Sequence, residues 1–269
     1  MKKKILTTCA ILMMAFLSVA AQSTENRNLS GFTKVSFGVS GNLNIRIGNE
    51  FKVVLEGDKD LLAAIETNVS NDRLTIRIKE RENRRRGRRD WNWYQSSESY
   101  RFRNEKVTIN ITMPAISELS VSGSGTAEVF DSFKTGSLSL SVSGSGKLIL
   151  NDVLSEDLSC SVSGSGGIII NSVSGKELDC RISGSGSIRI RGNGFFNNAD
   201  IGITGSGDYF GEFLKLDTAV IAVTGSGDCI CNVVNSLEAR VTGSGDITYH
   251  GNPPRINVRS TGSGKIRSR

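Results

Sequence analysis

Apolar and polar residues alternate along most of the chain with a period of two. In the second half the alternation runs through Leu138, Leu140 and Val142. It resumes at Leu148 and Leu150, after a tripeptide rich in glycine. A period of two is typical of β-strands with one buried face, because successive side chains of a strand point to opposite sides. The pattern therefore predicts an all-β protein whose short strands meet at glycine-rich corners.

The tripeptide Gly-Ser-Gly recurs at nearly constant spacing through residues 116–269. Its eight copies start at Gly123, Gly144, Gly164, Gly184, Gly205, Gly225, Gly243 and Gly262, with steps of 21, 20, 20, 21, 20, 18 and 19 residues. About twenty residues hold one strand, a sharp corner that glycine permits, a second strand and a return. We therefore expect a parallel β-helix, right-handed, with one repeat per coil. An irregular β-sandwich or a stack of hairpins is the alternative fold.

Equivalent residues of successive coils stack in a β-helix, so inward side chains form ladders. One buried ladder is predicted to contain Val142, Val162, Ile182, Ile203, Val223 and Val241. The same register turns four cysteines inward as small apolar residues, namely Cys160, Cys180, Cys229 and Cys231. The sequence does not decide whether Cys160 and Cys180 form a disulfide between adjacent coils. We expect no cofactor at these thiols, since His250 is the chain's single histidine and no clustered ligand set surrounds them.

The N-terminus has the features of a secretory signal peptide. A basic start at residues 2–4 precedes the apolar run from Ile5 to Ala20, and small residues lead to a cleavage point before Gln22. Residues 1–21 are thus predicted to be removed on export, which places the protein in the periplasm, at the cell surface or in the medium. No later stretch is apolar enough to form a transmembrane segment.

Residues 22–115 keep the β alternation but lack the tripeptide, and a segment of different composition interrupts them. Residues 80–105 contain eight arginines and five acidic residues, a net charge of +3. After removal of the signal peptide the whole chain has 30 basic and 27 acidic residues, which is the same net charge. Because the remainder is neutral, the alkaline isoelectric point does not indicate a general nucleic-acid binder.

This inserted segment is the candidate ligand-binding site. Arginine forks match phosphate and carboxylate groups, and aromatic rings stack on sugars or lie at lipid boundaries. We expect strands near Ile78 and Val107 to hold it as a projecting hairpin that binds an anionic envelope glycan, lipid headgroups or a surface protein. The alternative is a solvated tip whose tryptophans pack back onto the protein. The candidate residues are Arg84, Arg85, Arg86, Arg88, Arg89, Trp91, Trp93, Tyr94, Arg101 and Arg103.

A second candidate site is a column of carboxylates. Asp208, Asp228 and Asp246 follow the corner in three consecutive coils. Like charges at one strand spacing repel each other, and calcium, which prefers oxygen ligands, would relieve the repulsion. The alternative is that solvent screens the carboxylates and that Lys265 pairs with Asp246.

Residues 29–45, the run Glu56-Gly57-Asp58 and the Ser-Gly-Ser-Gly and Thr-Gly-Ser-Gly-Asp repeats resemble a bacterial family described as "putative auto-transporter adhesin, head GIN domain". The resemblance covers about residues 29–267 and implies a β-helix-like fold with an adhesive surface role and no established chemistry. We therefore expect an exported, non-enzymatic binding scaffold of the cell envelope. The alternatives are a β-helix enzyme that degrades polysaccharides, and a regulatory partner domain of the envelope.

Overall fold

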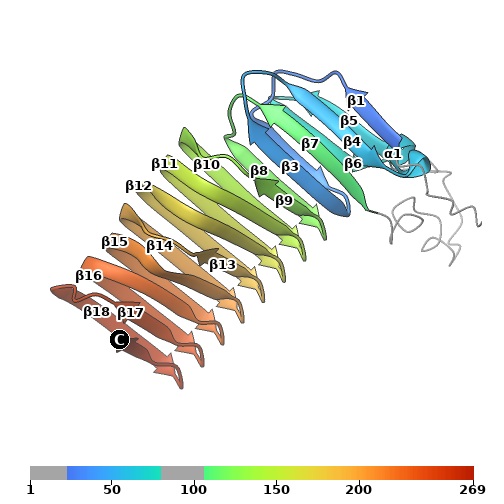
Figure 1. The fold of residues 1–269 in the computed structure, drawn as a ribbon. Coiled ribbons are helices and arrows are strands. Elements are labelled where there is room, and N and C mark those ends of the chain that lie inside the picture. The colour runs from blue at the N-terminus through green and yellow to red at the C-terminus, as the bar shows by residue number, and fades with distance from the viewer. Residues whose placement is uncertain (1–22, 80–105) are drawn as a thin grey trace, which may run out of the picture.

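The computed structural model describes residues 23–79 and 106–269, and these form a long stack of β-coils (Figure 1). The predicted all-β fold with a parallel β-helix of roughly twenty residues per coil is confirmed. The predicted signal peptide and the insertion 80–105 lie outside the described residues. The elements of the repeat region are β8 (Glu118–Gly123), β9 (Thr126–Val129), β10 (Phe133–Gly144), β11 (Lys147–Gly164), β12 (Gly167–Gly184), β13 (Ser187–Ile190), β14 (Gly194–Gly205), β15 (Asp208–Gly225), β16 (Cys229–Gly243), β17 (Ile247–His250), β18 (Arg255–Gly262) and β19 (Ile266–Ser268).

Successive coils pair in parallel and in one register. The first glycine of each Gly-Ser-Gly motif is paired with the first glycine of the next, so Gly144 lies beside Gly164, which lies beside Gly184. The same pairing continues to Gly262. Each strand is therefore about 4.8 Å from its equivalent in the next coil. We call the edge that carries these motifs the corner edge.

The two glycines of a motif are required for different reasons. Gly164 has φ +111°, a conformation that L side chains rarely adopt, and a Cβ there would lie 2.6 Å from the carbonyl oxygen of Gly144. Gly166 needs no positive φ, but a Cβ there would overlap the carbonyl oxygen of Gly146 in the preceding coil. The stacking of identical corners thus explains why both glycines recur.

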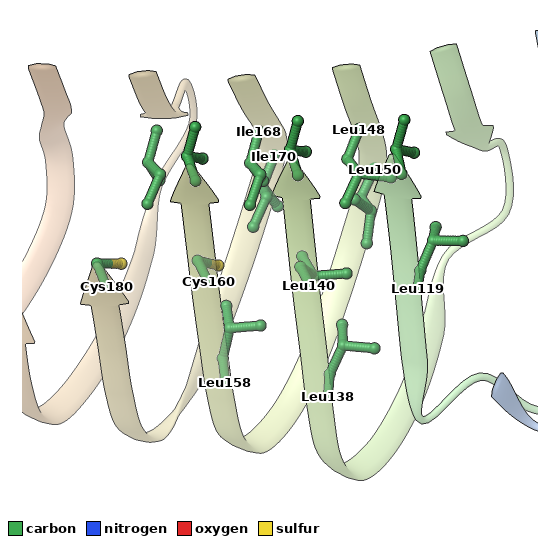
Figure 2. Close-up of a cluster of buried hydrophobic side chains, with 14 of the residues drawn as sticks. Leu119, Leu138, Leu140, Leu148, Leu150, Leu158, Cys160, Ile168, Ile170 and Cys180 are labelled. Atoms are coloured by element: carbon green, nitrogen blue, oxygen red, sulfur yellow. The ribbon is translucent and has the colours of Figure 1, made fainter. Parts of the chain in front are cut away.

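The inward alternation predicted from the sequence is confirmed in the core. All six residues of the ladder from Val142 to Val241 are at most 2% exposed. Figure 2 shows Leu119, Leu140, Cys160 and Cys180 at one level of successive coils. Side chains of the opposite strands, such as Leu150 and Ile170, fill the same interior, so the core is a continuous apolar column.

The stack extends into the N-terminal portion, where two more coils lack the tripeptide. β2 pairs in parallel with β8 on one side and β6 on the other, while β3 pairs with β9 and β7. Antiparallel strands then close this end, since β4 pairs with β7 and β1, and β5 pairs with β6. The elements are β1 (Ser23–Arg27), β2 (Lys34–Gly38), β3 (Gly41–Ile47), β4 (Lys52–Gly57), α1 (Lys59–Ala64), β5 (Ile65–Ser70), β6 (Arg73–Ile78) and β7 (Val107–Met113).

Candidate functional site

The strands that flank the arginine- and tryptophan-rich insertion do not pair with each other. β6 and β7 occupy the strand positions before and after the corner of the outermost coil, because they continue the pairing of β2 and β3. Strands end at Ile78 and begin at Val107 as expected, but they do not form the paired stem of a hairpin. Both strands meet the insertion at the corner edge of their coil. The residues assigned to ligand binding lie outside the described residues: Arg84, Arg85, Arg86, Arg88, Arg89, Trp91, Trp93, Tyr94, Arg101 and Arg103.

The carboxylates of the aspartate column accept hydrogen bonds from the backbone of the following coil. The N–H of Asp228 donates to Oδ1 of Asp208 at 3.0 Å, and the N–H of Asp246 donates to Oδ1 of Asp228 at 2.9 Å. The N–H of Lys265 donates to Oδ1 of Asp246 at 2.8 Å. Each aspartate carboxylate thus accepts a hydrogen bond from a backbone N–H of the next coil, at the point where the corner interrupts the pairing of the strands.

The ion pair at Asp246 is made by Arg267, whose Nη2 lies 3.0 Å from Oδ2. The expected partner Lys265 contributes its backbone N–H instead. Within residues 23–79 and 106–269, no three histidine, cysteine or acidic side chains are grouped so as to hold a metal ion. Calcium binding by the aspartate column stays an untested alternative to a purely structural role.

All four cysteines point into the core, as the register predicts, and are fully buried free thiols. Cys160 and Cys180 are partners in register. Contact with the Cys160 thiol and then burial raise the pKa of Cys180 well above its usual range, and Cys231 with burial does the same for the pKa of Cys229. Such thiols stay protonated and are poor nucleophiles, so they serve packing rather than covalent chemistry.

The edge opposite the corners carries exposed apolar side chains that the sequence analysis missed. We call this the return edge, where each coil passes from its second strand to the first strand of the next. Exposed fractions there are 47% for Leu154, 41% for Phe195, 53% for Phe213 and 39% for Val234. Each exposed residue is adjacent in sequence to a buried one: Val153, Phe196, Leu214 and Val233. Since neighbours on an extended chain face opposite ways, a doublet of apolar residues at a return was the signal available.

Leu154 and Phe195 line one groove on this edge, together with Lys134, Ser174 and Lys176. Its volume is about 290 Å³. A neighbouring hollow of about 430 Å³ shares Lys134, Leu154 and Ser174 and extends the groove within the same coils, toward Ser132, Asp152 and Ser172. The coil between Leu154 and Phe195 places Ser174 at the equivalent position, so the two large side chains stand on either side of a small one.

The groove carries one more positive than negative charge. Nζ of Lys176 lies 2.8 Å from Oε2 of Glu156, and this hydrogen bond is the main cause that lowers the pKa of Glu156. The charge of Lys134 contributes in the same direction. With one carboxylate between two ammonium groups, an apolar ligand with an anionic group fits the groove.

A third hollow, of about 360 Å³, lies on a flat face of the stack and is bordered by Asp157, Glu177, Asp179 and Asp200. Several of these carboxylates already have partners in the fold. Arg181 lies 2.9 Å from Asp179 and 3.0 Å from Asp200, and the side-chain amide of Asn198 donates to Glu177 at 2.7 Å. The return edge is therefore the better candidate for a ligand.

The family model described as "Putative auto-transporter adhesin, head GIN domain" matches residues 31–172 and 139–253, which is more than half of the chain. The chain belongs to this family. None of the curated proteins compared with the chain matches it. In the described part of this family member, no helix is both long and apolar enough to cross a membrane.

Three solved structures from the genus Parabacteroides share the fold over nearly the whole chain. A putative lipid binding protein from P. distasonis is 22% identical with a TM-score of 0.79, over 92% of this chain and 96% of that one. A putative adhesin from P. merdae is 19% identical with a TM-score of 0.77, over 92% and 96%. A putative adhesin from P. distasonis is 20% identical with a TM-score of 0.78, over 93% and 98%. At these identities the similarity shows the fold alone.

Proposed function

We propose that this family member is an exported, non-enzymatic, adhesin-like scaffold that binds lipids with anionic headgroups in the groove that Leu154 and Phe195 line on its return edge. The observation that carries the proposal is the groove in which Leu154 and Phe195 are exposed beside Lys134. The adhesin description of the family and the lipid-binding name of one structural neighbour support the same class of function.

The groove has the composition that an amphiphilic ligand requires. Full burial of a leucine or phenylalanine side chain contributes about 1.5–3 kcal/mol of favourable free energy. An acyl chain that enters the groove and covers Leu154 and Phe195 therefore gains part of this free energy on binding. An anionic headgroup next to Lys134 adds a charge-assisted hydrogen bond. The strands that carry these side chains are paired in register with their neighbours, so the backbone of the groove is already ordered and the ordering cost of binding is reduced.

The insertion is proposed as a second contact, with arginines for anionic glycan or lipid groups and tryptophans for sugar faces or the lipid boundary. Its flanking strands β6 and β7 end and begin at the corner edge, whereas the groove lies on the return edge. Export to the periplasm, the cell surface or the medium is proposed from residues 1–21. N-terminal sequencing of protein from the native host checks it, and a mature chain that retains Met1 would exclude cleavage.

Co-sedimentation with phosphatidylglycerol vesicles, compared with phosphatidylcholine vesicles, tests the lipid assignment. The double variant L154S/F195S gives both positions the residue found at Ser174, and we expect it to bind anionic vesicles at least tenfold more weakly. F213S is the matched control, because Phe213 is at least as exposed as Leu154 and Phe195 but does not line the groove. Equal losses in F213S would indicate general adsorption and overturn the groove. Unchanged binding by a folded L154S/F195S protein would overturn the proposed site.

A further inference from the structure

The last coil of the stack differs in charge from the coils before it. Residues 247–269 contain five basic and no acidic residues. Residues 106–246 contain nine basic and fifteen acidic residues. The β-helix is therefore acidic along its length and basic at the last coil, which is built from β18 and β19 and which Figure 1 places at the end of the stack farthest from β1.

This coil also exposes side chains that are buried elsewhere. Ile256 and Val258 lie in register with Leu237 and Ala239, which are 1% and 2% exposed. Ile256 is nevertheless 47% exposed and Val258 44% exposed. Among the described residues, β18 pairs only with β16 and β19 only with β17, whereas antiparallel strands cover the outer sides of β6 and β7 at the other end.

The outer side of β18 thus presents a row of backbone donors and acceptors that no described strand pairs. A lipid surface would cover Ile256 and Val258 but would leave these backbone groups unsatisfied, which is costly in an apolar medium. An added strand satisfies them and covers both side chains at once. The edge therefore favours an extended peptide over a membrane.

The positive charge of this edge determines which kind of peptide strand it would bind. Arg259 is in register with Arg240, so two guanidinium groups occupy neighbouring outward positions, which is unfavourable. A strand added beyond β18 places its side chains next to Arg255 and Arg259, where carboxylates would balance the charge. A second copy of the same edge would instead set five basic residues against five, which disfavours pairing of two such coils.

We propose that the outer edge of β18 is an interaction surface for an acidic extended segment of a partner protein, which adds to the β-helix as a further strand. This surface is independent of the lipid groove on the return edge.

The test uses the full chain and a dye-labelled, blocked peptide in which valine and glutamate alternate. Fluorescence anisotropy is expected to detect binding that weakens with salt. R255E/R259E should bind this peptide at least tenfold more weakly and should gain binding to the matching valine–lysine peptide. K147E/K215E, with the same charge change at exposed positions of other coils, should bind the valine–glutamate peptide like the wild type.

The lipid-groove variant L154S/F195S should also bind the peptide normally, which separates the two proposals. Peptide binding unchanged in a folded R255E/R259E protein would overturn the proposal. Sedimentation of the wild-type protein as a dimer, with R255E/R259E remaining a monomer, would also overturn it, because the edge would then bind a second copy of the chain. Anionic vesicle binding that depends on Arg255 and Arg259, without peptide binding, would assign it to lipid instead.

Discussion

The phenol ring of Tyr209 occupies the space above Gly211, two residues later on the same strand. A Cβ at Gly211 would lie 2.6 Å from the Tyr209 hydroxyl oxygen and 2.8 Å from Cε1. Tyr209 is in register with Ile188 of the preceding coil. If the same register continues by two residues, Gly211 lies opposite Ile190. One large and one absent side chain therefore fill the volume that two isoleucines fill in the preceding coil. The hydroxyl is buried without a hydrogen-bond partner among the described residues, and burial raises the pKa of Tyr209 well above its usual range.

This pairing predicts opposite effects for two small substitutions. G211A should destabilise the protein by about 1–3 kcal/mol, because the added methyl group meets a fully buried ring. Y209F should stabilise it by about 1 kcal/mol, because a buried unsatisfied hydroxyl is costly. Urea unfolding of both variants checks the pair. A clear loss of stability in Y209F would mean that the hydroxyl has a partner.

The buried ladder gives a second prediction. I203A should cost about 2–4 kcal/mol through lost burial and the cavity left behind. R240A removes an outward side chain of the same sheet and should cost well under 1 kcal/mol. Similar shifts of the urea midpoint in both variants would contradict the inward and outward assignment.

The corner glycines give a third prediction. G164A should lower the free energy of unfolding by about 1–3 kcal/mol, because alanine at φ +111° is strained and its Cβ meets the carbonyl oxygen of Gly144. Gly136 is the matched control, since a Cβ there has open space and its φ is not positive. G136A should be neutral or slightly stabilising. A thermal melt in which the two variants behave alike would contradict the account of the corner.

The aspartate column gives a fourth prediction. D228A removes the acceptor for the N–H of Asp246 and should cost about 1 kcal/mol, whereas D228N keeps an acceptor oxygen and should cost less. The melting temperature should not change with millimolar calcium or with chelator. A calcium-dependent rise that D228N abolishes would establish a metal site and contradict a purely structural role.

The sequence predicts the ladder and the corners well, because strict alternation and a constant repeat leave one consistent register for residues such as Val142 and Ile203. It does not predict the return edge, since adjacent apolar residues such as Val153 and Leu154 do not reveal which one turns inward. The two coils formed by β2, β3, β6 and β7 were also missed, because they lack Gly-Ser-Gly and because an insertion separates β6 from β7. Exposure of Ile256 depends on which strands pair with β18, which alternation alone does not specify.

The most direct test of the proposed function is to measure whether the groove contacts lipid. The only tryptophans of the chain are Trp91 and Trp93, so F195W in a W91F/W93F background places a single fluorophore in the groove. With phosphatidylglycerol vesicles whose acyl chains carry bromine, we expect its emission to shift to shorter wavelength and to be quenched. F213W in the same background should be quenched much less. Emission of F195W that is unchanged by brominated vesicles, although the protein is folded and bound, would contradict lipid binding at the return edge.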